Sequence, residues 1–280
     1  MSKTWLITGA SRGFGRKLAE AAAEAGDRVV ATARRPEQLE DLAERFGDRV
    51  RAVALDVTDP EAARRAVEQT VEAFGSLDVV VNNAGYANSA PIEETTEADF
   101  RAQIEANLFG VVNVTRAALP VLRQQRSGTF VQFSSVGGRA GGTPGMGAYQ
   151  TAKFAVEGFS EVLGGEVAPF GVRVVIVEPG AFRTDWQGSS MVRHEVGPDY
   201  EETVGAINRF RDETDGVQPG DPARAAQVIL DVVASDEPPR RLVLGAAAVE
   251  TVLAAEARRT EETRKWAEVS ASADFPADER

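Results

Sequence analysis

The chain has 280 residues, of which 43% are hydrophobic and 7% aromatic, and its formal net charge is −12. This acidic balance argues against general binding to nucleic acid or to an anionic membrane, because both need a basic surface. Cysteine is absent, which excludes disulfides and thiolate chemistry. Neither a signal-peptide pattern nor a run of about 18 apolar residues is found, so a cytoplasmic protein without a membrane span is expected.

Short apolar runs rich in Val, Leu and Ile alternate with longer helical patterns along most of the chain. The predicted strands are residues 4–8, 28–33, 49–55, 77–81, 128–134, 172–177 and 241–244. The predicted helices are residues 14–25, 36–46, 60–74, 97–125, 148–168 and 222–234. Such alternation predicts an α/β fold, with about seven strands in one doubly wound parallel sheet and helices on both faces.

Two later segments leave this rhythm. Residues 183–218 contain Gly, Pro and Ser around a weak helical pattern at 201–211, and they follow a predicted strand. A long insertion at this place is typical of a lid over the carboxyl edge of the sheet. Residues 249–269 form a charged helical pattern, and the polar residues 270–280 are expected to be a flexible tail. We therefore expect a single catalytic domain over residues 1–269.

The loop TGASRGFG (residues 8–15) joins the first predicted strand to the first predicted helix. Gly9, Ser11 and Gly13 fit the G-x-S-x-G turn that exposes a nucleophilic serine in hydrolases. The same loop also fits a phosphate cradle, in which glycines admit a pyrophosphate to the N–H groups that begin a helix; a plain tight turn is the third possibility. The only histidine, His194, lies in the predicted lid, and Ser11 follows the first strand rather than a central one. The phosphate cradle is therefore favoured.

A second group of polar residues lies between residues 132 and 153. Tyr149 and Lys153 are four residues apart at the start of a helical pattern, so their side chains lie on one face. An ammonium group beside a phenol lowers the pKa of the tyrosine from about 10, which suits proton transfer near neutral pH. Ser134 and Ser135 end the preceding strand, at the same sheet edge as the glycine loop. On spacing alone, however, an ordinary surface Tyr–Lys pair remains open.

Taken together, these residues resemble the short-chain dehydrogenase/reductase family. The resemblance covers residues 3–244 and rests on motifs in a fixed order. These are TGASRGFG, Asp56-Val57, NNAG at 82–85, Asn107, the serine pair, YQTAK at 149–153 and PGAFRT at 179–184. It implies a Rossmann-type sheet and a nicotinamide cofactor without a metal.

The resemblance also assigns roles to individual residues. It implies a catalytic tetrad of Asn107, Ser135, Tyr149 and Lys153, in which Tyr149 exchanges the proton, Ser135 orients the substrate oxygen and Lys153 holds the ribose. It implies that the cofactor lies along Gly9, Ser11, Arg12, Gly13, Phe14, Gly15, Arg34, Asp56, Val57, Asn83, Gly85, Tyr149, Lys153, Pro179, Gly180 and Thr184. One departure is present: the family places its serine thirteen residues before the tyrosine, and that position is Val136 here. We infer a one-residue insertion within residues 137–147 and keep Ser135, with Ser134 as the lesser candidate.

The end of the second predicted strand indicates which cofactor is used. NAD-binding folds place an acidic residue there for the ribose 2′-hydroxyl, whereas this chain has Ala33 followed by Arg34. Arg12 in the glycine loop adds a second cation. Two arginines without a carboxylate favour the 2′-phosphate of NADP(H), unless Arg34 and Arg35 are only solvated surface charges.

The sequence thus predicts an NADP(H)-dependent carbonyl reductase or alcohol dehydrogenase that acts on an uncharged or apolar small molecule. Candidate pocket residues, any of which could instead be ordinary packing, are Tyr86, Val136, Met146, Phe182, Trp186 and Met191. The alternatives are a non-catalytic NADP-sensing protein, a serine hydrolase using Ser11, and another reaction on the same scaffold such as epimerisation or dehydration. From the resemblance, a homodimer or tetramer through the helices bearing Asn107 and Tyr149 is expected.

Overall fold

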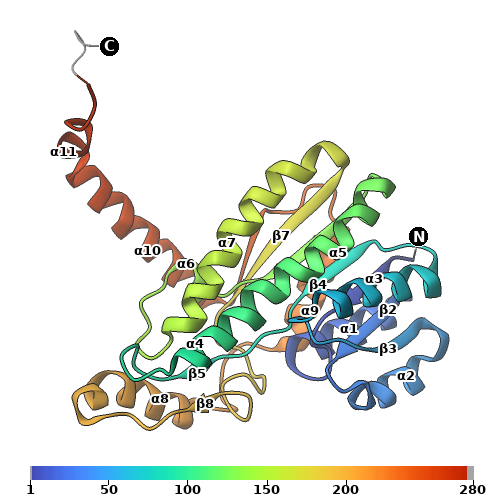
Figure 1. Ribbon diagram of the computed structural model, residues 1–280, viewed down its shortest axis with the longest axis horizontal. Coiled ribbons are helices and arrows are strands. Elements are labelled where there is room, and N and C mark those ends of the chain that lie inside the picture. Colours follow the sequence, from blue (N-terminus) through green and yellow to red (C-terminus); the bar gives the residue numbers. More distant parts are fainter. Residues whose placement is uncertain (1, 276–280) are drawn as a thin grey trace.

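Seven parallel strands form the central sheet, in the order β3-β2-β1-β4-β6-β7-β9 (Figure 1). The structure is a computed structural model, and it describes residues 2–275. The strands are β1 (Thr4–Ile7), β2 (Arg28–Ala33), β3 (Val50–Ala54), β4 (Val79–Asn82), β6 (Gly128–Phe133), β7 (Val172–Pro179) and β9 (Arg241–Leu244). The predicted doubly wound α/β fold is confirmed. The chain reverses its direction across the sheet between β1 and β4, where such folds bind ligands.

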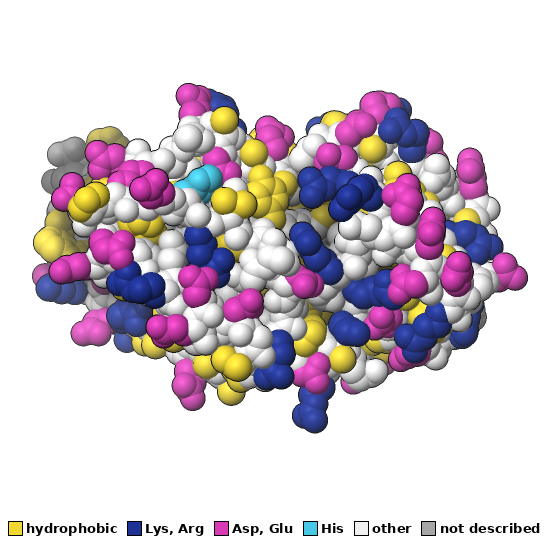
Figure 2. Space-filling model, turned by 90° about the horizontal axis from the view of Figure 1, so that it is seen from below, with side chains coloured by type: hydrophobic (Ala, Val, Ile, Leu, Met, Phe, Trp, Pro, Cys, Tyr) yellow, Lys and Arg dark blue, Asp and Glu magenta, His cyan; other side chains and the backbone are white. Residues whose placement is uncertain are grey.

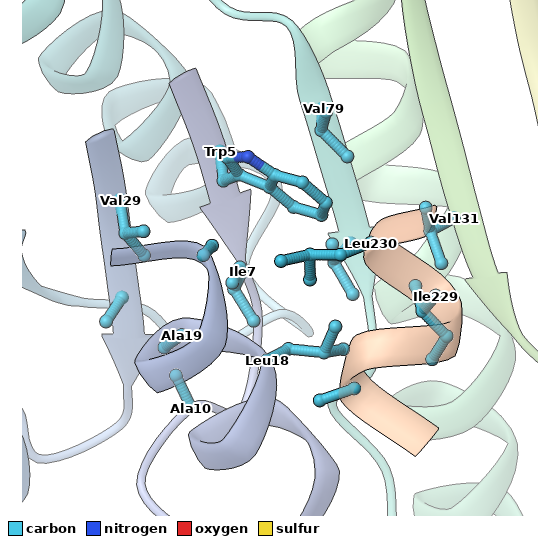
Figure 3. Packing of buried hydrophobic residues seen from close by; sticks show 14 of the residues in the cluster. Trp5, Ile7, Ala10, Leu18, Ala19, Val29, Val79, Val131, Ile229 and Leu230 are labelled. Atoms are coloured by element: carbon cyan, nitrogen blue, oxygen red, sulfur yellow. The ribbon is translucent and has the colours of Figure 1, made fainter. Parts of the chain in front are cut away.

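Helices cover both faces of the sheet because successive strand residues point to opposite sides. Trp5 and Ile7 of β1 pack against one helical layer and Leu6 against the other. The first layer contains α1 (Gly13–Glu24), α2 (Glu40–Phe46) and α9 (Pro222–Ala234). The second contains α3 (Pro60–Phe74), α5 (Gly110–Gln125) and α7 (Gly147–Val167). Figure 3 shows the first layer, where Leu18 of α1 and Ile229 and Leu230 of α9 converge on β1.

Two predicted helices are divided in the structure. The segment 97–125 consists of α4 (Glu97–Ile104), a π-helical turn η3 (Glu105–Phe109) and α5. The segment 36–46 begins with a 3₁₀ turn, η1 (Pro36–Leu39), before α2. Two further 3₁₀ turns, η2 (Gly47–Arg49) and η4 (Ala168–Phe170), lead into strands. Helical periodicity does not distinguish these tighter and wider turns from an α-helix, so the sequence did not predict them.

The insertion predicted at 183–218 contributes one strand to a small second sheet. This strand, β8 (Val192–Arg193), pairs in parallel with β5 (Asn88–Ser89), which follows β4. The rest contains η5 (Pro198–Tyr200), a π-helical turn η6 (Glu201–Gly205) and α8 (Ala206–Thr214). Figure 1 shows these elements together at one end of the molecule. We call residues 183–218 the lid segment.

The C-terminal region forms α10 (Ala246–Lys265) and α11 (Ala267–Ala271), close to the helix predicted at 249–269. Figure 1 shows α10 running away from the sheet, with its first turns near the short helix α6 (Val136–Arg139). Of the tail predicted as flexible, residues 276–280 lie outside the described residues. Within residues 2–275, no helix is both long and apolar enough to cross a bilayer.

Candidate active site

A cavity of about 670 Å³, including its open mouth, lies at the carboxyl ends of the central strands. Its walls come from the loops that follow β1, β4, β6 and β7, together with α7 and the start of the lid segment. The lining residues are Phe14, Asn83, Gly85, Asn107, Phe133, Ser134, Ser135, Tyr149, Lys153, Pro179, Gly180, Ala181, Phe182, Thr184, Trp186 and Gln187. Residues from six separate sequence motifs therefore meet in one cavity.

The glycine loop after β1 is shaped for a close approach of backbone to backbone. Gly9 has φ +65°, and a Cβ at Gly15 would lie 2.4 Å from the Gly9 carbonyl oxygen, so a side chain has no room there. Asn83 Nδ2 donates to the carbonyl oxygens of Thr8 (2.9 Å) and Gly9 (3.1 Å), which joins the loops after β1 and β4. Because this loop carries glycines, a ligand beside it can come close to the backbone.

The N-terminus of α1 begins at Gly13, and its N-cap residue Arg12 makes no side-chain capping bond. The first N–H groups of α1 are therefore available to an anion. Both Arg12 and Arg34, which follows β2, are exposed, while Ala33 is buried. The adenine-side candidates Asp56 and Val57 follow β3; Asp56 accepts from the N–H and the hydroxyl of Thr58. These features fit a nucleotide with a charged phosphate group.

Tyr149 and Lys153 lie one turn apart at the start of α7, and both are buried. Lys153 Nζ donates to the carbonyl oxygen of Phe133 at 2.7 Å and lies 5.6 Å from the centre of the Tyr149 ring. Trp186 covers the other side of that ring, with the two ring centroids 5.2 Å apart. The predicted pair is thus part of the cavity wall and not an exposed pair on a helix surface.

The ionisation of this pair differs from the sequence expectation. Burial raises the pKa of Tyr149 to about 12, and a hydrogen bond with Ser135 opposes this only in part. Burial also lowers the pKa of Lys153 to about 8, although the nearby Glu157 carboxylate acts to raise it. The expected lowering of the tyrosine pKa is therefore not seen, because loss of solvent outweighs the hydrogen bond with Ser135. At neutral pH both side chains hold their protons.

The two serines after β6 point to different partners. Ser135 interacts with Tyr149, and its hydroxyl also accepts from the Gly137 N–H at 3.0 Å as the N-cap of α6. Ser134 lies close enough to the Glu157 carboxylate to lower the pKa of that group, although it has no well-aligned hydrogen-bond partner among the described residues. The geometry therefore places Ser135, and not Ser134, beside Tyr149.

Asn107 occupies the middle of the π-helical turn η3 and is fully buried. Its Nδ2 donates to the carbonyl oxygens of Tyr86 and Gln103, each at 2.8 Å. Its Oδ1 has no partner among the described residues and faces Gly85, where a Cβ would lie 2.4 Å from this oxygen and 3.7 Å from Lys153 Nζ. An acceptor without a protein partner among the described residues thus lies beside Gly85, in the same cavity as Lys153.

The candidate pocket residues divide into three groups. Met146, Met191 and Trp186 pack against Tyr149. Phe182 packs instead against Phe14, with ring centroids 5.0 Å apart, and so lies on the glycine-loop side of the cavity. Of these candidates, only Phe182 and Trp186 line the cavity itself; Tyr86, Val136, Met146 and Met191 are not among its lining residues. The pKa of Tyr86 is raised by burial and by the charge of Asp99, and the charge of Arg34, which follows β2, acts to lower it.

Three cavity residues, Phe133, Ala181 and Gln187, were missed from the sequence, and the hydrolase alternative receives no support from the geometry. Gln187 joins the start of the lid segment to α8 within the same segment, since its Nε2 donates to Arg211 O and Thr214 Oγ1. Only its position next to Trp186 could have indicated this. His194 Nε2 lies 3.5 Å from Asp99 Oδ2, and no interaction within residues 2–275 joins it to Ser11.

The face around the lid segment is mixed in character. Figure 2 views the molecule from the end that carries β5, β8 and α8 in Figure 1. Hydrophobic side chains gather near the middle of this face, beside a cluster of Lys and Arg side chains, and acidic side chains are spread around them. An acidic protein thus retains a locally basic region, as an anionic ligand requires.

Fold and cavity together define a nucleotide-binding α/β protein whose cavity holds a buried Tyr–Lys pair. Comparison with protein families identifies residues 3–194 as a short chain dehydrogenase, so the chain belongs to the short-chain dehydrogenase family and is an oxidoreductase. The resemblance inferred from the sequence motifs is confirmed. Members of this family bind nicotinamide cofactors, either NAD or NADP.

Individual relatives agree over nearly the whole chain. The oxidoreductase BOA17 of Botryotinia fuckeliana is 51% identical over 271 residues, which cover 96% of this chain and 98% of that protein. A short-chain dehydrogenase from Streptomyces avermitilis has a TM-score of 0.92 and 43% identity, covering 98% of this chain and 100% of its own. An alcohol dehydrogenase from the archaeon Thermococcus sibiricus, solved with 5-hydroxy-NADP, has a TM-score of 0.71 and 29% identity, covering 87% and 96%.

Proposed function

We propose that this protein is an NADP(H)-dependent carbonyl reductase or alcohol dehydrogenase, with Tyr149 as the general acid and base. The observation that carries the proposal is the convergence of Tyr149, Ser135, Lys153 and Asn107 on one cavity that Phe14 of the glycine loop also lines. When bound, the nicotinamide would supply the hydride that is exchanged with a ketone or secondary alcohol.

The residues of the chain supply the proton and the orientation. Because the pKa of Tyr149 is raised to about 12, its phenol keeps its proton at neutral pH and can donate it to a substrate oxygen. Ser135, which interacts with this phenol, orients the same oxygen. Lys153 Nζ lies 5.6 Å from the centre of the Tyr149 ring, where its ammonium group can hold the cofactor ribose and stabilise the phenolate left after proton transfer. This arrangement favours reduction at neutral pH.

Gly9, Gly13 and Gly15, with Ser11 and Phe14, would form the pyrophosphate cradle, since the loop leaves backbone N–H groups open. Asn83 and Gly85 would lie along the ribose, Asp56 and Val57 beside the adenine, and Pro179, Gly180 and Thr184 beside the carboxamide. Arg12 and Arg34 are exposed and make no ion pair among those found in residues 2–275, so both are available for a 2′-phosphate. Ala33 leaves no acid to repel it.

The substrate we propose is an uncharged small molecule with an apolar part. Lys153 is the only charged side chain among the cavity-lining residues, and it is already committed to Phe133 O. Trp186 gives the cavity an apolar wall beside Tyr149, and Met146 and Met191 pack in the same cluster without lining the cavity. An anionic substrate would find no free cation beside the reacting carbon and would lose its hydration there.

Replacing Tyr149 by Phe tests the mechanism. The substitution removes one hydroxyl without changing the ring, so NADPH binding measured by fluorescence should stay within about twofold while kcat for carbonyl reduction falls about 10²- to 10⁴-fold. Wild-type protein assayed on a carbonyl panel is the reference. Turnover close to wild type would contradict the mechanism. If the wild type binds NADPH but reduces no member of the panel, the non-catalytic sensing role is supported instead; ester hydrolysis that is lost in Ser11→Ala would support the hydrolase.

Replacing Arg34 by Ala tests the choice of cofactor. If Arg34 contacts the 2′-phosphate, the KM for NADPH should rise about 10- to 100-fold and the KM for NADH should change little, because a charge-assisted hydrogen bond contributes about 1.5–3 kcal/mol. Arg35→Ala is the matched control, since Arg35 is also exposed and follows directly. A lower KM for NADH than for NADPH in the wild type would overturn the assignment.

A further inference from the structure

A cluster of charged side chains adjoins the helix that carries Tyr149 and Lys153. Glu178, the residue before the end of β7, is fully buried; Arg139 Nη1 and Arg241 Nε approach its two oxygens at 3.1 Å and 3.2 Å. Arg241 Nε also lies 3.1 Å from Oε2 of Glu157, a buried residue of α7. Two buried carboxylates and two partly exposed guanidinium groups, from four elements, therefore form one cluster.

Glu157 lies one helical turn after Lys153, so both side chains project from the same face of α7. Of all the charged groups in residues 2–275, only Glu157 perceptibly changes the ionisation of Lys153, and it favours the ammonium form. Burial acts in the opposite direction. The charge of Lys153 is thus decided between the loss of solvent and this one carboxylate.

Glu157 is poorly explained by stability alone. Its Oε1 is buried without a hydrogen-bond partner among the described residues, and burial raises the pKa of the carboxyl group. A buried carboxylate that is only partly satisfied destabilises a fold relative to an apolar side chain of similar size. Glu157 is therefore better explained by the negative charge that it places near Lys153 than by a contribution to stability.

We propose that Glu157 is a positioning residue that keeps Lys153 charged and directed toward Phe133 O and the cofactor ribose. A neutral lysine would lose one of its N–H donors and its attraction for the phenolate. Ser134, which lies beside the Glu157 carboxylate, supports this group, whereas Ser135 serves Tyr149. The consequence for catalysis rests on the proposed function, but the effect on Lys153 does not.

The titratable and charged groups around Lys153 and Glu157 come from four elements. Helix α7 itself contributes Tyr149, and the other elements contribute Arg139 from α6, Glu178 from β7 and Arg241 from β9. Burial opposes ionisation of Glu157 and the two arginines favour its carboxylate, while burial and the charge of Glu157 raise the pKa of Glu178. Replacing Glu157 by Gln removes the one negative charge that acts on Lys153 and nearly preserves the volume.

The test is to titrate Lys153 directly. The chain has four lysines, Lys3, Lys17, Lys153 and Lys265, so the ¹³Cε signal of Lys153 can be assigned in labelled protein by its loss in Lys153→Arg. In Glu157→Gln we expect the titration midpoint of Lys153 to fall by about one pH unit, since removing a nearby buried carboxylate disfavours the ammonium form. The alkaline limb of kcat for carbonyl reduction should shift to lower pH by the same amount.

Glu161→Gln is the matched control. Glu161 lies one further turn along α7 and also pairs with Arg241, but it does not influence Lys153. It should leave the Lys153 midpoint unchanged. An unchanged midpoint in folded Glu157→Gln, or an equal shift in Glu161→Gln, would overturn the proposal. A shifted midpoint in a protein that reduces no carbonyl would retain the role of Glu157 and count against the proposed function instead.

The wild-type protein provides a measurement that does not depend on whether Glu157→Gln folds. Burial raises the pKa of the Glu157 carboxyl group above its ordinary value, so this group takes up its proton at a higher pH than an exposed glutamate does. The Lys153 signal should therefore show a second, smaller step as Glu157 takes up its proton. A single-step curve over the folded range would contradict the coupling.

Discussion

Lys153 is held in the interior against its own solvation. Its side chain is buried, its single protein acceptor is Phe133 O, and its pKa falls to about 8 from an ordinary value of 10.5. Below pH 8 the lysine is charged in both the folded and the unfolded chain, so burying the ammonium group lowers the free energy of unfolding by its full amount. Between pH 8 and 10.5 the folded protein releases this proton while the unfolded chain keeps it, and this loss of stability disappears.

Lys153→Met should therefore stabilise the protein while it abolishes turnover. Allowing for the Phe133 carbonyl that loses its donor, we expect the free energy of unfolding at pH 7 to rise by about 1–2 kcal/mol. The gain should shrink as the pH increases from 8 to 10.5. Urea unfolding at pH 7 and pH 10, followed by circular dichroism, measures both effects. A less stable variant at pH 7 would show that the lysine contributes more through its contacts than it loses through burial.

Two short elements position the proposed catalytic side chains. The π-helical turn η3 carries Asn107, whose Nδ2 donates to both Tyr86 O and Gln103 O while its Oδ1 faces Gly85. Helix α6 has Ser135 as its N-cap, and Gly138 lies so close to Lys153 that a Cβ there would be 2.9 Å from the lysine Cβ. The insertion inferred within residues 137–147 stays a prediction, and its range overlaps α6.

Helix α10 holds α6 in place through Arg139. Arg139 pairs with the buried Glu178 and with Glu256 of α10, and Arg259 of α10 donates to the carbonyl oxygens of Arg139 and Ala140. The Glu256 pair is partly exposed and the Glu178 pair is not. The two halves of this connection should therefore contribute very differently to stability.

Arg139→Met should lower the free energy of unfolding by about 2–3 kcal/mol, because it leaves the buried Glu178 with a single cation. Glu256→Gln, the matched variant on the exposed side, should lower it by less than about 1 kcal/mol. Chemical unfolding of both variants at pH 7 gives the comparison. Equal losses would mean that α10, and not the buried pair, dominates the stability of this region.

At the scale of the whole molecule, the fold was predictable because buried parallel strands are continuous apolar runs. All seven strands of the main sheet lie where Val, Leu and Ile concentrate. The strands β5 and β8 were not predicted, because two residues are too few to show such a pattern. They pair with each other, and β8 belongs to the lid segment. The turn η3 was missed for a related reason, because one additional residue per turn does not disturb a helical pattern visibly.

Several residues of the candidate site could be named from the sequence, but the shifts of their pKa values could not. Tyr149, Lys153, Ser135 and Asn107 were named from their motifs, whereas the direction of the Tyr149 pKa depends on burial, which spacing does not reveal. The charge network was also missed. Glu178 is a single acid at the end of the apolar strand β7, and that contrast was the available signal. Its partners Arg139 and Arg241 come from distant segments, so only the folded chain shows them together.

Association of the chain with itself, expected through the helices bearing Asn107 and Tyr149, stays a prediction that the surface allows us to test. Helix α7 exposes Phe154 and Val162, whose exposed fractions are 42% and 62%. Helix α10 exposes Leu253 to nearly the same degree, 61%, on a different part of the molecule. The two aliphatic residues therefore serve as matched probes of two faces.

Val162→Glu should shift the sedimentation of the protein toward the monomer, and Leu253→Glu should leave it unchanged. A carboxylate buried in an apolar interface costs about 2–4 kcal/mol, which weakens association about 30- to 1000-fold. Analytical ultracentrifugation over a range of protein concentrations measures this difference, and circular dichroism verifies that both variants are folded. Dissociation caused by Leu253→Glu alone would place the interface on α10, and a monomeric wild type would refute self-association altogether.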